Sequence, residues 1–174
     1  MKKAIALFGR ESNSTPELEK MAYEIGAEIA KAGAVLINGG RAGTMKAASK
    51  GAKDNKGFVV GLLPGADKSD ANDFVDVAIP TGLDAARGIL IARAADAVIM
   101  LGGGNGTLSE VCNAYAIFKP IVAIEGSGGW ADKIVGTYID EKKKVLIRGA
   151  KTAKDAVALA LKLAEESKCQ PTRK

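Results

Sequence analysis

Apolar residues in this chain come in short consecutive runs, separated by longer segments in which they recur with a helical period. Consecutive apolar positions are typical of strands that are covered on both faces of a sheet. Seven such runs predict strands at 4–8, 34–37, 58–63, 75–79, 97–101, 121–124 and 144–147. The periodic segments predict helices at 16–32, 44–55, 83–95, 107–118, 130–140 and 152–168. Because strands and helices alternate, we expect an α/β fold with a doubly wound, mostly parallel sheet of about seven strands.

The chain length favours a single domain. Its 174 residues fall within the roughly 100–200 residues of an ordinary domain, and no Pro- or Ser-rich linker interrupts the pattern. We expect one domain over 1–168 and a basic tail at 169–174. Doubly wound sheets bind ligands beyond the carboxyl ends of their strands, where the strand order reverses. The segments that follow the strands are therefore where a site is expected.

Two of these segments share a pattern of glycines. Each has an apolar run, Gly-Gly, two variable residues and then Gly-Thr. Glycine lets the backbone approach an anion, and the helix N-terminus that follows offers unpaired N–H groups. The phosphate-binding residues that this pattern predicts are Gly39, Gly40, Gly43, Thr44, Gly102, Gly103, Gly104, Asn105, Gly106 and Thr107. The alternative is that these glycines only serve sharp turns between a strand and a helix.

Two familiar phosphate-binding motifs are absent from these segments. No Lys follows the last glycine of either turn, so neither turn is a Walker loop. The segment after the first predicted strand, Gly9-Arg10-Glu11-Ser12, lacks the G-x-G-x-x-G pattern of dinucleotide-binding proteins. The usual dinucleotide site is therefore not predicted.

Glu110 and Arg87 are the two charged residues that we single out as functional. Thr107 and Glu110 fit a capping box, in which Glu110 would only stabilise the start of a helix. However, Thr44 is followed three positions later by Ala47, so the equivalent turn has no carboxylate. Arg87 is expected near a helix N-terminus, where a cation opposes the helix dipole, and Arg is suited to bidentate contact with phosphate.

The composition excludes several kinds of site. The chain has no histidine, which removes His-based triads, His general bases and His-ligated metals. Its two cysteines, Cys112 and Cys169, are too few for a disulfide scaffold and indicate a reducing compartment. The acidic residues Asp67, Asp70 and Asp73 are typical of a solvated loop, so no metal site and no required cofactor are predicted.

Charge and hydropathy suggest where the chain works and what it binds. The net charge of +5 comes largely from 142–144 and the last two residues, and the few aromatic residues are scattered. A nucleic-acid partner is therefore not expected. No run reaches the ~18 apolar residues of a membrane span, and the apolar run near the N-terminus is too short for a signal peptide. We expect a cytoplasmic protein with no membrane partner.

These motifs together resemble the LOG-like Rossmann superfamily. The resemblance is carried by Gly39-Gly40-Arg-Ala-Gly43-Thr-Met45, Thr81-Gly82 with Arg87, Ala95-Asp96, and Gly102-Gly-Gly-Asn-Gly-Thr-Leu-Ser-Glu110, and it spans about residues 4–125. The superfamily includes LOG-type phosphoribohydrolases, often labelled lysine decarboxylases, molybdenum cofactor carrier proteins and the more distant DprA/Smf-related proteins. The resemblance implies a Rossmann-like fold. By motif, Arg87 and Glu110 match the catalytic pair of the hydrolases.

Two departures make the chain more similar to the carrier-protein branch. The hydrolase pattern has Arg-Lys and Pro-Gly-Gly, where this chain has Arg87-Gly88 and Leu101-Gly102-Gly103. The three consecutive glycines, and the run from Pro64-Gly65 through Asn72 to Thr81-Gly82, are carrier-like. That branch is thought to hold a phosphate-bearing pterin rather than to turn it over.

Two functions follow from the resemblance. The first is binding of a phosphorylated small molecule, a nucleotide or a molybdopterin-type cofactor, at the two glycine turns. The alternative is a nucleoside 5′-monophosphate phosphoribohydrolase, which would release base and ribose 5-phosphate, with Glu110 facing the anomeric carbon. Glu11, Asp84 or a water would then protonate the leaving base.

The relatives also imply an assembly. A homodimer or homotetramer is expected, because relatives pair through helices beside the site. The segment 107–118 carries an apolar stripe of Val111, Ala114, Tyr115 and Phe118. This stripe either forms the contact between subunits or packs on the sheet.

Overall fold

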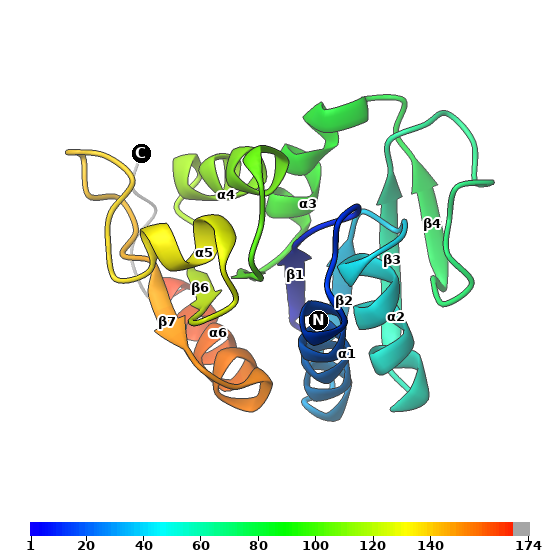
Figure 1. Cartoon of the computed structure of the whole chain (residues 1–174), viewed down its shortest axis with the longest axis horizontal. Helices are drawn as coiled ribbons and strands as arrows, with labels where there is room; N and C mark the ends of the chain where they lie inside the picture. The colour runs from blue at the N-terminus through cyan, green and yellow to red at the C-terminus, as the bar shows by residue number, and fades with distance from the viewer. Residues whose placement is uncertain (169–174) are drawn as a thin grey trace.

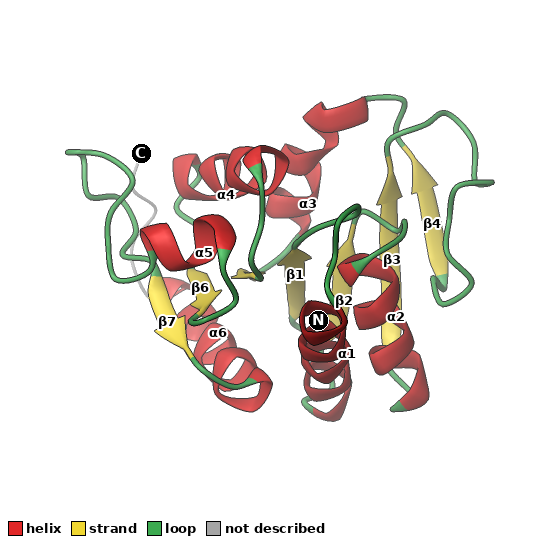
Figure 2. Ribbon diagram, viewed as in Figure 1, coloured by secondary structure: helices red, strands yellow, loops and turns green. Residues whose placement is uncertain are grey.

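The computed structural model describes residues 1–168, and the basic tail predicted at 169–174 lies outside these residues. The strands are β1 (Ala4–Phe8), β2 (Val35–Asn38), β3 (Phe58–Leu63), β4 (Val77–Pro80), β5 (Ala97–Met100), β6 (Ile121–Ile124) and β7 (Arg148–Ala150). The α-helices are α1 (Pro16–Lys31), α2 (Thr44–Asp54), α3 (Gly88–Ala94), α4 (Asn105–Ala116), α5 (Gly129–Ile134) and α6 (Ala153–Lys168). A short 3₁₀ helix, η1 (Asp84–Arg87), precedes α3. Figure 2 shows the helices and strands in separate colours.

The sheet confirms the predicted α/β architecture. Its seven strands are all parallel, in the order β4-β3-β2-β1-β5-β6-β7. The order reverses at β1, which pairs with β2 on one side and β5 on the other. The carboxyl ends of β1, β2 and β5 therefore lie together, at the position where sheets of this kind bind ligands.

Helices cover both faces of this sheet (Figure 1). One core cluster joins the sheet to α1, α2 and α6, and a second joins it to α3, α4 and α5. The strands between them are almost entirely buried: β5 and β6 have no exposed residue. This explains why the strands could be recognised as unbroken apolar runs rather than alternating ones.

The N-terminal half follows the predicted elements closely. α1 begins where the sequence indicated, because the Thr15 side chain accepts a hydrogen bond from Leu18 N at 3.3 Å and Pro16 occupies the first helical position. Two glycines then allow α1 and α2 to touch. A Cβ on Gly26 would lie 1.9 Å from Ala48 O, and a Cβ on Gly51 would lie 2.0 Å from Tyr23 O.

Five predicted elements were wrong in their bounds or form. The strand expected at 144–147 is not in the sheet: Ile147 N donates to Thr137 O, and β7 begins one residue later. The helix expected at 130–140 ends at Ile134, because Gly136 takes a left-handed φ of 75°. The helix expected at 83–95 is divided between η1 and α3. The strand expected at 75–79 starts at Val77, and the helix expected at 107–118 starts at Asn105.

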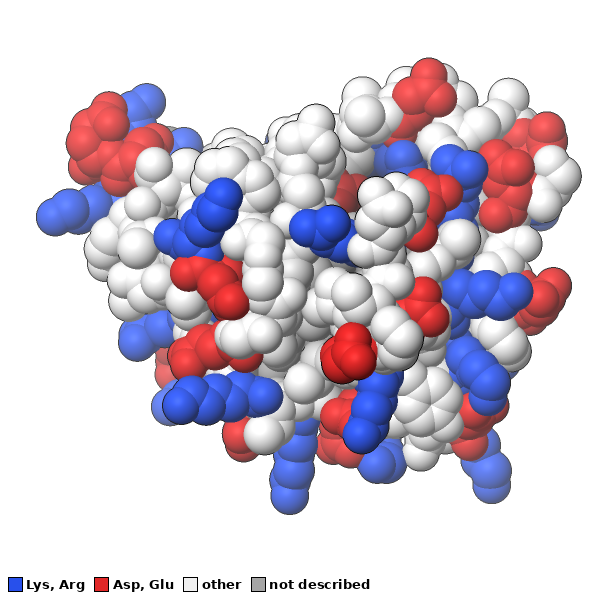
Figure 3. Space-filling view, in the orientation of Figure 1, with Lys and Arg blue, Asp and Glu red and all other residues white. Residues whose placement is uncertain are grey.

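The charged side chains on one face of the molecule, and the length and apolar character of the helices, bear on the partners considered above. On the face drawn in Figure 3, acidic and basic side chains are interspersed rather than gathered into a basic surface. None of the helices within residues 1–168 has the length and apolar character needed to cross a bilayer.

Candidate functional site

A cavity of about 370 Å³ opens at the carboxyl ends of the central strands. Its walls come from the loop after β1, the start of α4, the end of β2 and the segment around η1. The lining residues are Leu7, Phe8, Gly9, Arg10, Glu11, Ser12, Asn13, Gly39, Met45, Ala85, Arg87, Gly104, Asn105, Gly106, Thr107, Ser109 and Glu110. The cavity therefore joins both predicted catalytic residues, Arg87 and Glu110, with most of the second glycine turn and with Gly39 of the first.

The N-terminus of α4 provides the anion-binding feature of this cavity. The helix begins after Gly104, and its first internal hydrogen bond runs from Leu108 N to Gly104 O at 3.0 Å. The amides of 105–107 precede that bond, so they have no partner within the helix. A Cβ at Gly104 or Gly106 would meet nothing within 4 Å, so the backbone is open to a ligand. Such a helix end favours phosphate or another anion.

The first two glycines of the same turn hold it in place instead. Gly102 N donates to the Ser127 hydroxyl oxygen at 2.9 Å. The carbonyl oxygens of Gly102 and Gly103 accept hydrogen bonds from Ala131 N and Trp130 N, at 2.9 and 3.1 Å. Gly102 and Gly103 are thus used in packing the turn against α5, and neither lines the cavity.

The first glycine turn is closed by the loop that follows β1. Thr44 N and the Thr44 hydroxyl both donate to Arg10 O, each at 2.9 Å. A Cβ on Gly43 would lie only 2.4 Å from Arg10 O and from Glu11 O. Of the residues predicted from this turn, Gly39 lines the cavity, whereas Gly40, Gly43 and Thr44 do not. The two turns therefore match in sequence but contribute differently to this cavity: Gly39 comes from the first turn, and Gly104 to Thr107 come from the second.

Thr107 connects α4 to the first strand. Its hydroxyl donates to Gly9 O at 3.0 Å, and the residue lies inside the first turn of the helix rather than at its N-cap. The capping box considered for Thr107 and Glu110 is therefore not formed, because the cap position belongs to Gly104. The hydroxyl holds the loop after β1 against the helix N-terminus.

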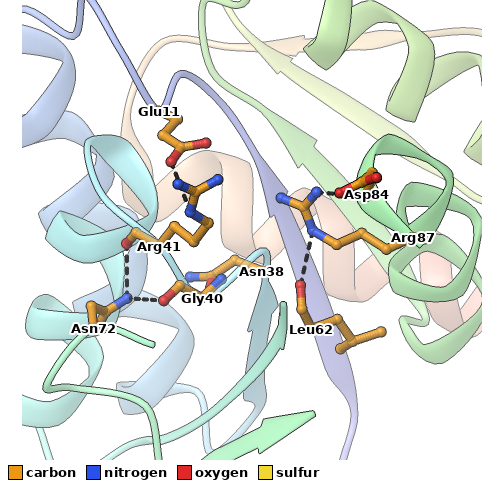
Figure 4. Close-up of polar contacts among 8 residues, drawn as sticks. All are labelled: Glu11, Asn38, Gly40, Arg41, Leu62, Asn72, Asp84 and Arg87. Carbon is orange, nitrogen blue, oxygen red and sulfur yellow. Dashed lines mark hydrogen bonds and ion pairs between the residues drawn. The ribbon is translucent and has the colours of Figure 1, made fainter. Parts of the chain in front are cut away.

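Arg87 is a buried cation whose orientation is fixed by two backbone carbonyls. It is 9% exposed, and its Nε donates to Leu62 O at 2.9 Å while Nη1 donates to Asp84 O at 2.8 Å (Figure 4). Nη2 lies beside Gly39, where an added Cβ would be 2.8 Å away. The guanidinium group therefore reaches the cavity wall with donors that these two bonds do not use.

Glu110 lines the same cavity, and its pKa is raised above the ordinary value. Burial raises its pKa from 4.5 to about 7, and the positive charge of Arg87 only partly offsets this. Helix α3 packs directly on this side chain, since a Cβ at Gly88 would lie 2.9 Å from Glu110 Cγ. The hydrolase pattern has Lys at the position of Gly88. In this structure, a side chain at position 88 would displace Glu110.

A second carboxylate lines the cavity at the loop after β1. Glu11 Oε1 lies 3.0 Å from Arg41 Nε, and both side chains are somewhat more than one third exposed. From the sequence, Glu11 is expected only as one of several possible proton donors, and Arg41 has no predicted role of its own. The sequence signal that points to Glu11 is its position shortly after the end of a predicted strand. Asp84, the other carboxylate considered, does not line the cavity.

Comparison with known proteins identifies the family. The family model for the SLOG cluster4 family matches residues 2–160. The chain belongs to the SLOG cluster4 family. This SLOG protein is 33% identical to the molybdenum cofactor binding protein from Rippkaea orientalis, with a TM-score of 0.84 over 94% of this chain and 98% of that one. Against the molybdenum cofactor carrier protein from Chlamydomonas reinhardtii, the identity is 31% and the TM-score 0.77, over 95% and 99% of the two chains.

A curated enzyme is also related to this SLOG protein. The cytokinin riboside 5′-monophosphate phosphoribohydrolase from Mycobacterium tuberculosis is 32% identical over 133 residues, which cover 71% of each chain. This chain is thus similar both to molybdenum cofactor binding and carrier proteins and to a cytokinin riboside 5′-monophosphate phosphoribohydrolase. Within residues 1–168, no group of three or more Cys, Asp or Glu residues is placed to hold a metal ion.

Proposed function

We propose that this SLOG protein binds the phosphate end of a small phosphorylated molecule, either a nucleotide or a molybdopterin-type compound, and acts as a binding or carrier protein. The observation that carries the proposal is the open N-terminus of α4 in the cavity wall, with Arg87 fixed in the same cavity. The backbone amides of 105–107 would hold the phosphate oxygens, and Arg87 would add a charged donor. The structural likeness to molybdenum cofactor binding and carrier proteins supports this function.

Among the described residues 1–168, the cavity lining includes no cysteine, and Cys112, on α4, lies outside the cavity. A molybdenum-bearing ligand would therefore be recognised through its phosphate and its heterocycle, with no thiolate bond from this cavity to the metal. Under this proposal such a compound is cargo rather than a resident cofactor.

Substitution of Gly106 tests the binding site directly. Gly106→Asp places a negative charge in the first turn of α4, where it repels phosphate but interacts well with the helix dipole. We expect the variant to fold with unchanged or higher thermal stability and to lose binding of inorganic phosphate and AMP. Wild-type protein should melt several degrees higher at millimolar ligand, because ligand binding stabilises the folded state by mass action.

Gly106→Ala is the matched control. It adds only a methyl group in open space, so ligand-induced stabilisation should persist. Ligand binding that survives equally well in the Asp variant would remove the α4 N-terminus from the site. The proposal would also be overturned if neither phosphate, AMP nor GMP changed the melting temperature of the wild-type protein.

Hydrolysis of nucleoside monophosphates is the second candidate, and the half-buried Glu110 in the cavity that also contains Arg87 favours it. With phosphate held at α4, an ionised Glu110 would stabilise positive charge at the anomeric carbon or activate a water molecule. Its pKa of about 7 means that the carboxylate form increases through neutral pH. The rate of base release should therefore rise between about pH 6 and pH 8.

Chromatography of AMP incubated with the protein measures this activity as free adenine. We expect Glu110→Gln to abolish release, and Glu165→Gln, a change at an exposed carboxylate on α6, to leave it unchanged. Unchanged turnover in the Glu110 variant would remove this residue from the mechanism. Binding without any free base would leave the carrier function alone.

A further inference from the structure

Glu11 and Arg41 form an ion pair that the proposed phosphate site does not use. Figure 4 shows Arg41 reaching from the turn after β2 to the Glu11 carboxylate on the loop after β1. Arg41 binds Oε1, which leaves the second carboxylate oxygen with lone pairs to spare. Glu11 lines the cavity, and its side chain is 37% exposed.

The backbone beneath this ion pair is anchored. Asn72 Nδ2 donates to both Gly40 O and Arg41 O at 2.9 Å, and Asn72 N donates to Gly40 O at 2.8 Å (Figure 4). On the other side, the carbonyl of Arg10 receives two hydrogen bonds from Thr44. Both residues of the ion pair therefore project from backbone that is tied to its neighbours, and Arg41 is the residue that contacts the carboxylate itself.

A carboxylate at this position divides the cavity by charge. The open amides of α4 and the Arg87 guanidinium favour the anionic end of a ligand, whereas a carboxylate that is already paired with Arg41 does not. The loop carrying Glu11 is joined to α4 at Gly9, and two residues of chain extend at most about 7 Å. A molecule with its phosphate at α4 can therefore place its other end against Glu11. An ionised carboxylate only accepts hydrogen bonds, so that end must donate them.

We propose that Glu11 is a specificity-determining residue that recognises a heterocycle with a ring N–H next to an exocyclic amine, as in the 2-amino-4-oxopyrimidine edge of guanine and pterins. This inference rests on the proposed binding of a phosphorylated ligand and specifies its other end. Two adjacent N–H donors match a carboxylate acceptor. Adenine presents an unprotonated ring nitrogen beside its amine, which would face the carboxylate lone pairs. Hypoxanthine retains the ring N–H but lacks the amine.

Calorimetric titration with GMP, IMP, AMP and inorganic phosphate tests the assignment. We expect affinity to decrease from GMP through IMP to AMP, with GMP bound about tenfold or more tightly than AMP. Glu11→Gln should reduce GMP affinity about tenfold, because the amide replaces one acceptor by a donor, while phosphate binding is unchanged or stronger. Glu165→Gln, with the same loss of charge on α6, should behave as wild type.

The results separate this inference from the proposed function. Equal affinity of wild-type protein for GMP and AMP would overturn the role of Glu11 and leave phosphate binding intact. The inference also fails if Glu11→Gln weakens GMP, AMP and phosphate alike, because the residue would then only support the fold. Absence of binding by all four probes would overturn the phosphate site itself. The wild-type comparison of GMP with AMP needs no variant, so poor folding of Glu11→Gln cannot obscure the outcome.

Discussion

The Glu110 carboxyl group occupies a site that penalises its ionised form. Its pKa is about 7 in the folded protein against an ordinary 4.5, so the folded state holds this proton more tightly than the unfolded state does. Stability is therefore lost as the pH rises from about 4.5 towards 7, and the full penalty applies above that range. Glu110→Gln removes the penalty. Urea unfolding should find the variant more stable than wild type by on the order of 1–2 kcal/mol at about pH 8, with little difference at about pH 5.

Glu165→Gln serves as the reference for this pH dependence. The Glu165 side chain is exposed, so the unfolding free energy of this variant should follow that of the wild type at both pH values. A constant difference between Glu110→Gln and wild type across the same range would show that Glu110 titrates alike in the folded and unfolded states.

At the scale of single residues, the sequence could indicate which side chains are candidates for a functional role, but not which residues they contact in the fold. Glu110 and Arg87 were singled out from charge, position and motif, and the structure brings both to one cavity. The role of Thr107 was missed because the start of α4 depends on the backbone at Gly104 and on a bond to Gly9, nearly a hundred residues away. Such a tertiary contact leaves no trace in the local pattern.

At the scale of elements, the contact between α1 and α2 depends on two glycines. A methyl group at Gly26 would meet the backbone of Ala48, which cannot rotate away as a side chain would. We expect Gly26→Ala to separate the two helices and lower the free energy of unfolding by about 1–3 kcal/mol, despite the better helix propensity of Ala. Denaturant unfolding followed by circular dichroism measures the change.

Gly106→Ala is the matched change at a helical glycine with free space around it. Here the higher helix propensity of Ala should leave stability unchanged or raise it by up to about 1 kcal/mol. Equal effects of the two substitutions would mean that propensity, and not the close approach of α1 and α2, determines the result at Gly26.

Element boundaries were predictable where local signals and tertiary pairing agree. β1 and the start of α1 follow from an apolar run and from the Thr15-Pro16 cap. The run at 144–147 has an equally good strand pattern, but its backbone pairs with the chain after α5: Gly136 N donates to Ile147 O, and Ile147 N donates to Thr137 O. The next three residues therefore form β7 in the sheet. The apolar pattern alone cannot show which of these two segments pairs with β6.

At the scale of the whole molecule, the stripe expected on 107–118 does not face outward as a whole. Val111, Ala114 and Tyr115 belong to the core between α4 and the sheet, and only Phe118 is strongly exposed.

Another apolar surface lies at the edge strand β4 (Figure 1), where Val77 and Ile79 are 42% and 43% exposed. They pair in register with Val60 and Leu62 and so extend the same face of the sheet. An exposed apolar edge strand is a typical site of association between subunits.

We therefore propose that β4 contributes to a homo-oligomer. Light scattering coupled to size exclusion should give wild-type protein a mass of at least twice the 17.9 kDa chain. Combined Val77→Lys and Ile79→Lys substitutions should shift it towards the monomer, because charges on an edge oppose pairing. Tyr138→Lys, at a similarly exposed apolar residue distant in sequence, should retain the wild-type mass. A monomeric wild-type protein would refute the proposal, and an unchanged mass in the double variant would place the subunit contact elsewhere on the surface.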